Sequence, residues 1–289
     1  MRVILTGGLG NQLFKLMAAQ KFLDRFPKSK IKLDISWYSD GNQNLRESHI
    51  FFQLGDLADN KQYFVTSTRF PRFYAYLIGK VRKFGSNTLD FLGIYSDNSN
   101  LTNLQRAPLV FFGNFESTKY LPEFKSAEKI FLRLDSGSSW KQELVADINQ
   151  HDPIIVHVRL GDYLNFPDVY GFLDDKYFVD GVRHLRSKGA SGPLWLTSDN
   201  PELAKERLSG KLKFDRVLVT PPNLPPLQLL LGIAAARNLV IAHSTFSWWA
   251  AWISSNRQGN SNIVMPSRFL AEETQTQRLQ VSGWHVINV

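Results

Sequence analysis

The sequence predicts an α/β fold made of two Rossmann-like domains, residues 1–150 and 151–289. Two series of strand-length apolar runs alternate with helix-length stretches, one starting at Arg2 and the other near Pro153. This alternation is typical of βαβ units, whose parallel strands form a sheet covered by helices on both faces. A chain of 289 residues is long enough for two domains, each with its own core.

The first series predicts a strand at Arg2–Thr6, a helix at Leu13–Arg25 and a second strand at Ile31–Ile35. The helix is expected because apolar side chains recur at the three- and four-residue spacing of one helix face. Residues 36–150 are less regular and contain one further apolar run, Leu109–Phe112.

The second series is more regular, with buried-type strands separated by helices. The expected strands are Ile154–Val158, Leu194–Thr197, Val217–Thr220, Leu239–Ala242 and Ile263–Met265, and the expected helices are Leu227–Arg237 and Ser247–Ser254. The pair Asn200-Pro201 predicts another helix start, with Asn200 as the N-cap and Pro201 at the first helical position. Asp174-Asp175 is a further expected helix start.

Composition excludes several classes of protein. The chain has no cysteine, which excludes a disulfide scaffold, a thiolate zinc site and a cysteine nucleophile. Its net charge of +8 favours an anionic partner such as a nucleotide, a nucleic acid or an acidic membrane. Since no signal-type or membrane-spanning apolar segment occurs, we expect a cytoplasmic protein.

Part of the positive charge is concentrated in residues 61–84, because no acid occurs between Asp59 and Asp90. Aromatic and aliphatic residues interleave with the cations there. The cations are Lys61, Arg69, Arg72, Lys80, Arg82 and Lys83. Such a stretch could bind the surface of an anionic membrane peripherally, or it could be a solvated helix face whose aromatic side chains belong to the core.

The first candidate site is the glycine-rich junction between the first strand and helix. Gly8 and Gly10 would let a ligand approach the backbone, and the amides of Asn11 and Gln12 suit hydroxyl or phosphate groups. The segment is neither GxGxxG nor a P-loop, and its glycines could simply form a tight turn.

The second candidate is the segment His157-Val158-Arg159-Leu160-Gly161-Asp162-Tyr163. His157 and Arg159 share one face at a strand end, and the planar guanidinium of Arg159 suits a diphosphate. The alternative is a structural ion pair between Arg159 and Asp162 beside a core histidine.

The third candidate follows the expected strand Leu239–Ala242. His243, Ser244 and Thr245 precede a helix, and hydroxyls with free N–H groups at a helix N-terminus form an anion site. Phe246 could stack on a ring, whereas the tryptophans that follow it are expected to pack. Ser244 is not a convincing nucleophile because no GxSxG elbow surrounds it.

A metal site is not predicted. The six histidines are scattered, and neither HExxH nor a DxD triplet occurs. If a diphosphate binds, arginine and helix N-termini must neutralise it.

The strings GGLGNQLFKLMAAQ, HVRLGDY and HSTFSWWAAWIS resemble the bacterial α-1,2-fucosyltransferases of glycosyltransferase family 11. The resemblance runs from Gly7 to about Pro266 and implies a GT-B fold, in which two Rossmann-like domains face each other across a cleft. Residues 1–150 would then form the acceptor side and residues 151–289 the donor side. It further implies inverting, metal-independent transfer of fucose from GDP-fucose, without a cofactor, to the 2-hydroxyl of a galactose-containing acceptor. The acceptor would be an oligosaccharide or a lipid-linked glycan of O-antigen synthesis, in the bacterial cytoplasm or at the inner face of the membrane.

The resemblance also implies roles for individual residues. Arg159 would hold the diphosphate with His157 beside it, and either Asp162 or His157 would take the acceptor proton. The residues expected to contact the donor are Gly8, Gly10, Asn11, Gln12, Asp199, His243, Ser244, Thr245 and Phe246, with Asp199 meeting guanine.

Three positions depart from the family pattern. The family usually has Asn at the position of His243, Asp at that of Asn200, and an acid near Leu227-Gln228. These departures are expected near the nucleotide pocket. They leave open a transferase of the same fold that uses another nucleotide sugar, such as another GDP-deoxyhexose. A more distant alternative is a nucleic-acid-binding protein, although no RNP, KH or helix-turn-helix pattern occurs.

Overall fold

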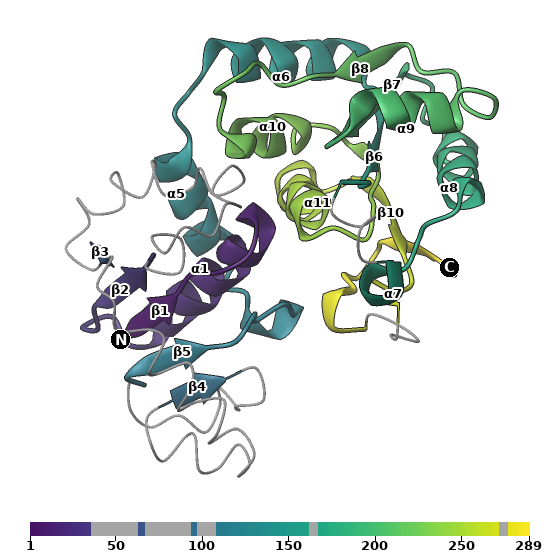
Figure 1. Cartoon of the computed structure of the whole chain (residues 1–289). Helices are drawn as coiled ribbons and strands as arrows, with labels where there is room; N and C mark the ends of the chain where they lie inside the picture. The colour runs from purple at the N-terminus through teal and green to yellow at the C-terminus, as the bar shows by residue number, and fades with distance from the viewer. Residues whose placement is uncertain (36–62, 67–93, 97–107, 162–166, 272–276) are drawn as a thin grey trace. The chain divides into compact units, whose positions relative to one another are not determined.

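The computed structural model of the protein describes residues 1–35, 63–66, 94–96, 108–161, 167–271 and 277–289 (Figure 1). The chain divides into two compact units, Met1–Ser136 and Gly137–Val289. The sequence placed this division after residue 150. The helix α6 (Ser139–His151) nevertheless groups with the second unit, because it packs on α10 (Pro226–Ile233) of that unit.

The described part of the first unit contains a parallel five-stranded sheet. Its strands, in spatial order, are β3 (Tyr63–Thr66), β2 (Ile31–Asp34), β1 (Arg2–Ile4), β5 (Val110–Phe112) and β4 (Ile94–Ser96).

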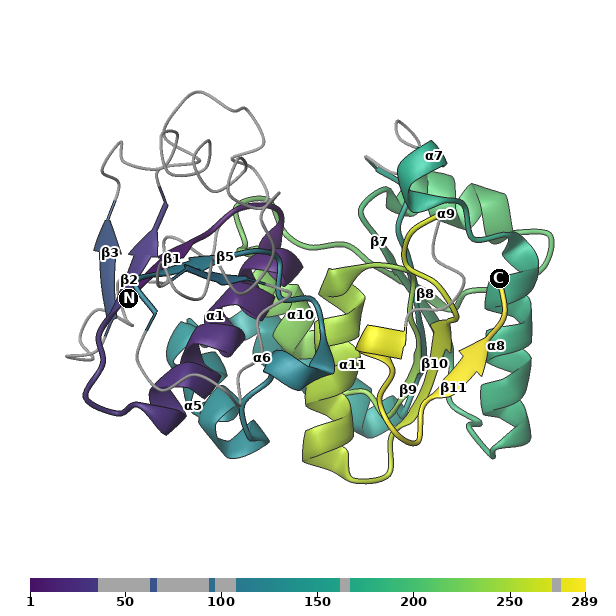
Figure 2. The ribbon, with the colours of Figure 1, turned by 90° about the horizontal axis from the view of Figure 1, so that it is seen from below.

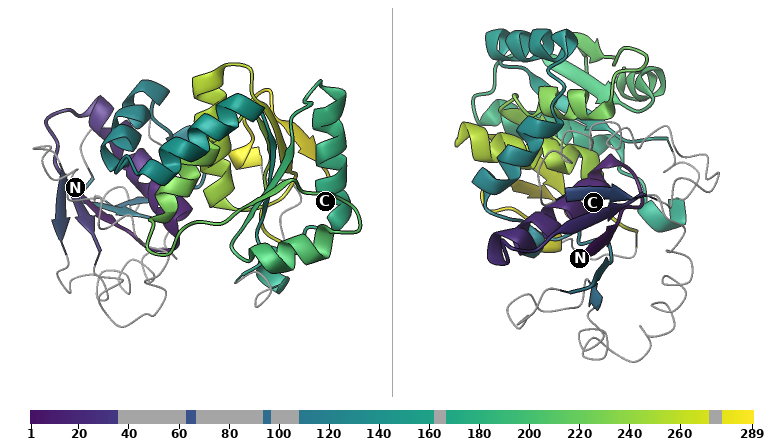
Figure 3. Two further views of the ribbon diagram at one scale, coloured as in Figure 1. Left: turned by 90° about the horizontal axis from the view of Figure 1, so that it is seen from above. Right: turned by 90° about the vertical axis from the view of Figure 1, so that its left-hand side faces the viewer.

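Two helices of the first unit, α1 (Leu9–Arg25) and α5 (Phe124–Leu134), pack against each other (Figure 3), and a short 3₁₀ helix, η5 (Thr118–Tyr120), precedes α5. The strands predicted around Arg2 and Ile31 and the helix predicted between them are confirmed. An aromatic cluster forms one side of the core. It joins α1, the sheet and the segment before α5, and its rings belong to Phe22, Tyr95, Phe111, Phe115 and Tyr120.

The second unit has a parallel six-stranded sheet within the described residues. Its strands, in spatial order, are β11 (His285–Ile287), β10 (Asn262–Pro266), β9 (Asn238–Val240), β6 (Ile154–Val158), β7 (Leu194–Ser198) and β8 (Arg216–Leu218). Numbered along the chain from β6, this is the strand order 3-2-1-4-5-6 of the Rossmann fold. The predicted α/β class, with two Rossmann-like units, is therefore confirmed.

Helices cover both faces of the second sheet (Figure 2). The helices α8 (Asp175–Ser187) and α9 (Pro201–Leu208) lie on one face, and α10 and α11 (Thr245–Gln258) lie on the other. Two further short helices, α7 (Pro167–Tyr170) and η7 (Gln277–Leu279), lie in connections.

Local sequence explains where these helices begin and end. Asp174 caps α8, accepting a hydrogen bond from the N–H of Tyr177, and Asn200 caps α9, as predicted. The helix α10 ends at Ile233 rather than at the predicted Arg237, because residues 234–236 form tight turns that lead directly into β9. Gly259, with φ +69°, ends α11 in the left-handed conformation that glycine adopts without strain.

The tryptophans of α11 pack in the core, as predicted. Trp248 and Trp249 are fully buried and meet edge to face, with ring centroids 5.2 Å apart. The indole N–H of Trp248 donates to the carbonyl of Leu279 at 2.8 Å, which anchors the helix to the chain near the C-terminus. Because α11 is anchored in this way, its first turn is held firmly at the edge of the sheet.

Candidate functional site

The strand order of the second sheet reverses between β6 and β9. In open α/β sheets, ligands bind outside the carboxyl ends of the strands at such a switch point. His157 and Arg159 lie at the carboxyl end of β6, while His243 and Ser244 follow β9 and lead into α11. The second and third candidate segments therefore meet at one edge of this sheet.

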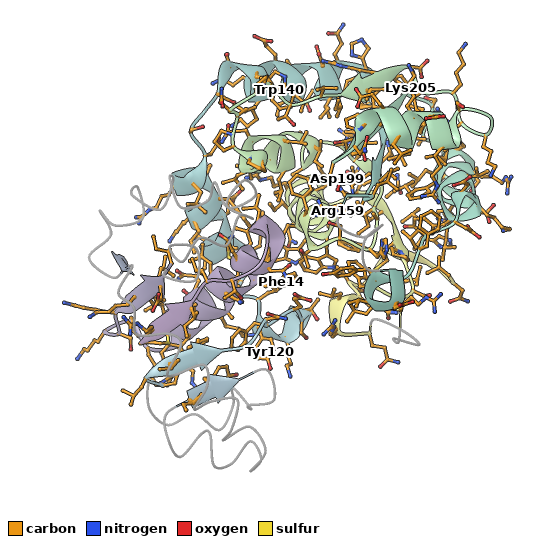
Figure 4. All side chains as sticks on the ribbon, viewed as in Figure 1. Phe14, Tyr120, Trp140, Arg159, Asp199 and Lys205 are labelled. Carbon is orange, nitrogen blue, oxygen red and sulfur yellow. The ribbon has the colours of Figure 1, made fainter. Side chains whose placement is uncertain are left out.

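Arg159 and Asp199 form an ion pair at this edge (Figure 4), with Nη1 of Arg159 3.2 Å from Oδ2 of Asp199. Their side chains are 17% and 21% exposed, so the guanidinium is held in place while part of it faces solvent. The sequence alternative paired Arg159 with Asp162, which lies outside the described residues. Among the described residues, the partner of Arg159 is Asp199 at the end of β7, and the pairing with Asp162 stays a prediction.

His157 is buried, and its ring stacks on that of Phe246. Its Nδ1 is buried and has no hydrogen-bond partner among the described residues. Burial lowers the pKa of His157 to about 4; the Asp199 carboxylate opposes this shift, whereas Arg159 and His243 add to it. The imidazole is therefore neutral at pH 7 and can donate or accept a hydrogen bond without carrying charge.

His243 is also a buried, neutral imidazole. Burial lowers its pKa to about 4; the nearby backbone of Gly171 opposes the shift, and the nearby Arg159 guanidinium adds to it.

The third candidate segment forms the first turn of α11. Ser244 is its N-cap residue, but the hydroxyl makes no capping hydrogen bond, and the first turn holds no acidic residue. The first N–H groups of a helix have no partner within it and carry the positive end of the helix dipole. Thr245 and Phe246 are partly exposed there. This helix start therefore suits an anion.

The first candidate segment lies at the carboxyl end of β1, in the first unit. Gly8 is the N-cap of α1 and Gly10 is buried in its first turn. Gln12 is fully buried and its Nε2 donates to the carbonyl of Gly7 at 2.9 Å, so this amide holds the turn. A Cβ added at Gly7, whose φ is +79°, would lie 3.0 Å from Nδ2 of Asn11, so Asn11 also packs on the turn.

Two residues that the sequence analysis missed lie at these strand ends. Lys15 is buried and its Nζ contacts the hydroxyl of Thr6 at the end of β1. Thr197 is buried in β7, in register with His157, and its hydroxyl has no hydrogen-bond partner among the described residues. The available signal was a polar residue within an apolar run, a lysine in one case and a threonine in the other.

Two of the three departures from the family pattern have structural roles. Asn200 caps α9 by accepting from the N–H of Leu203 at 3.3 Å. Gln228 is buried, and its Oε1 accepts from the hydroxyl of Ser138 at 3.0 Å, which joins α10 to the start of α6. Gln228 therefore has a structural role in the α6–α10 contact, and the expectation that it lies near the nucleotide pocket stays a prediction.

Other expectations concern metals, membranes and the basic segment. Among the described residues, no group of three or more His, Asp or Glu side chains could hold a metal ion. No helix in the described ranges is long and apolar enough to span a bilayer. Apart from Tyr63–Thr66, the basic segment 61–84 lies outside the described residues.

Comparison with known proteins identifies the family. The chain is 25% identical over 259 residues to an alpha-1,2-colitosyltransferase of Escherichia coli, covering 87% of this chain and 86% of the relative. It is 22% identical over an alignment of 306 residues to the O-antigen biosynthesis glycosyltransferase WbnK of Escherichia coli, covering 97% and 98%. A solved structure, the fucosyltransferase NodZ from Bradyrhizobium, is 14% identical with a TM-score of 0.48, covering 86% of this chain and 92% of that one.

The family model of glycosyl transferase family 11 matches residues 111–288. The match covers more than half of the chain and includes β6, β7, β9 and the start of α11. Two Rossmann-like units in this family correspond to the GT-B type of fold. The chain therefore belongs to glycosyl transferase family 11 and is a glycosyltransferase.

Proposed function

We propose that the chain transfers fucose from GDP-fucose to the 2-hydroxyl of a galactose-containing glycan, with inversion at the anomeric carbon. The carrying observation is that Arg159 and the start of α11, where Ser244 makes no capping hydrogen bond, lie at one switch point, with the neutral His157 stacked on Phe246 of that helix start. A guanidinium and a helix N-terminus are the groups that proteins use to bind diphosphates. The relatives named for α-1,2-colitosyl transfer and O-antigen biosynthesis support a role in surface polysaccharide synthesis.

The mechanism follows from where charge develops. Transfer breaks the bond between the anomeric carbon and the β-phosphate oxygen, so negative charge accumulates on the departing GDP. Arg159 and the first N–H groups of α11 are fixed positive groups that can stabilise this charge as it forms. They would favour the transition state over the bound donor, whose bridging oxygen carries less charge.

The acceptor hydroxyl attacks the anomeric carbon from the face opposite the diphosphate and loses its proton to a base. Burial, a pKa of about 4 and the stacked Phe246 ring make His157 poorly suited to this role. We therefore assign the proton to the carboxylate of Asp162, which follows the Arg159 segment in sequence. His157 would serve as a neutral hydrogen-bonding group beside the donor.

A second candidate donor is the GDP-linked form of colitose. The relative named an alpha-1,2-colitosyltransferase favours this candidate. Colitose lacks the 3-hydroxyl of fucose, so a hydrogen bond from the protein to that hydroxyl would discriminate between the two donors.

The proposed setting is the inner face of a bacterial membrane, where the basic segment 61–84 could contact anionic lipid.

A donor screen followed by product analysis tests this function. The purified chain is heated with GDP, UDP or dTDP, and GDP should raise the unfolding temperature most, because stabilisation follows affinity. It is then incubated with lactose and either GDP-fucose or GDP-colitose. NMR of the product should show an α-1,2 linkage to galactose. Preferential stabilisation by UDP or dTDP, or transfer to another hydroxyl, would overturn the proposal.

A further inference from the structure

Both carboxylate oxygens of Asp199 are directed at the end of β6. Oδ1 accepts a hydrogen bond from the backbone N–H of Leu160 at 2.9 Å, and Oδ2 lies 3.2 Å from Nη1 of Arg159. A single carboxylate at the end of β7 thus contacts two consecutive residues that follow β6. It fixes the backbone at Leu160 and the direction of the Arg159 side chain together.

Gly161 provides the space for this carboxylate. A Cβ added at Gly161 would lie 2.2 Å from Oδ2 of Asp199, far inside van der Waals contact. Gly161 is not among the glycines with positive φ, so its backbone conformation does not require glycine. The absence of a side chain at this position is therefore a requirement of space for Asp199.

The backbone around Asp199 is itself held in place. The hydroxyl of Ser198 accepts from the N–H of Asn200 at 3.1 Å, and Asn200 caps α9 by accepting from the N–H of Leu203. Asp199 thus stands in a short junction between a strand and a capped helix. Such a rigid support is what a group needs if it is to orient another side chain accurately.

We propose that Asp199, seated against Gly161, is a positioning residue that directs the Arg159 guanidinium at the donor diphosphate. This rests on the proposed function for the nature of the ligand, and it differs from the guanine-reading role that the family resemblance implies. Recognition of the guanine edge by a carboxylate uses both oxygens on neighbouring N–H groups of the base. In this protein the two oxygens are engaged by Leu160 and Arg159.

The test uses two probes that share the diphosphate but differ in the base. Binding of GDP and of inorganic pyrophosphate is measured for the wild type, Asp199→Asn and Gly161→Ala, with kcat and KM for GDP-fucose and for lactose. Asp199→Asn keeps an oxygen for Leu160 but removes the charge, and Gly161→Ala displaces an intact carboxylate. The matched control is Asp180→Asn, which removes another ion-paired carboxylate on the exposed side of α8.

Both site variants should weaken GDP and pyrophosphate by the same factor, about tenfold or more, as expected for disturbance of a charged hydrogen bond. They should also lower kcat, while KM for lactose and the unfolding temperature stay close to wild type. The control should match the wild type in every measurement. Equal weakening of GDP and of pyrophosphate would place the loss at the diphosphate and not at the base.

A loss confined to GDP, with pyrophosphate binding intact, would overturn the proposal and assign Asp199 to the base. Unchanged binding and kcat in Asp199→Asn would also overturn it. If Gly161→Ala does not fold, the measurements on Asp199→Asn alone still test the proposal. Failure of the donor assignment is recognised separately, because the wild type would then bind UDP or dTDP more tightly than GDP.

Discussion

The imidazole of His157 stacks on the ring of Phe246, with centroids 5.6 Å apart and ring planes 26° apart. His157 belongs to the strand β6 and Phe246 to the first turn of α11, so this contact joins the two segments that we assign to the donor diphosphate. It also removes the imidazole from water. A neutral His157 leaves the positive charge of the site to Arg159 and the helix start, where the departing GDP can use it.

The first prediction concerns stability against pH. Burial lowers the pKa of His157 and of His243 to about 4, below the value near 6.5 of an unfolded chain. Between these values the unfolded chain binds more protons than the folded one. The stability that these histidines contribute is therefore complete above pH 6.5 and is lost as the pH falls toward 4, by at most about 1.4 kcal/mol per pH unit for each histidine.

Urea unfolding at a series of pH values between 7 and 4 measures this loss. The variant His157→Phe should show a smaller decrease of the unfolding free energy with acidification than the wild type, because it lacks one of the two buried titrating groups. An identical pH slope in the two proteins would contradict a buried, neutral His157.

The second prediction concerns Arg159→Ala. Removing the guanidinium takes away a fixed positive group aimed at the developing charge, so kcat/KM should fall by about 10²–10³, or roughly 2.7–4 kcal/mol in the barrier. Circular dichroism should show an intact fold. Arg183→Ala, on the exposed side of α8, is the matched control and should retain full activity. Turnover by Arg159→Ala at the wild-type rate would exclude the diphosphate role.

The third prediction is that transfer continues in excess EDTA. The proposed site provides its positive charge through Arg159 and the start of α11, so the departing diphosphate needs no divalent cation. Initial rates with and without EDTA should agree within error after extensive dialysis. Loss of activity that Mn²⁺ or Mg²⁺ restores would refute this.

The sequence predicted the regular strands of the second unit well. Long apolar runs and the Asn200-Pro201 start carry strong local signals, and each became a strand or helix end near its predicted position. The end of α10 was less predictable, because the apolar and helix-favouring Ala234–Ala236 run carries no stop signal. The helix ends early there because the chain must enter the strand β9, which is set by tertiary structure and not by local sequence.

The site was predicted in its parts but not in its contacts. Hydroxyl residues before a helix and an arginine at a strand end can be recognised from the sequence alone. The pairing of Arg159 with Asp199 is not, because it joins neighbouring strands that are 40 positions apart in the chain. Likewise, Gln12 belongs to a motif typical of ligand sites, yet its amide holds a turn, which only the backbone geometry reveals.

The fourth prediction concerns the basic segment 61–84. Replacing Lys80, Arg82 and Lys83 by glutamine should weaken cosedimentation with vesicles that contain anionic lipid, since each cation near such a surface contributes about 1 kcal/mol. Neutral vesicles are the control, and transfer to soluble lactose should be unchanged. Equal cosedimentation of the variant would assign the segment to a solvated surface.

The fifth prediction concerns Asn200, where the family usually has aspartate. Its side chain caps α9, and aspartate caps helices as well as asparagine does. Asn200→Ala should therefore lower the free energy of unfolding by about 1 kcal/mol, whereas Asn200→Asp should leave it nearly unchanged. Because the cap contacts Leu203 rather than the ion pair, Asn200→Asp should also keep the wild-type ratio of rates with GDP-fucose and GDP-colitose. A changed ratio would mean that this departure from the family pattern selects the donor sugar, and that the cap is not its main role.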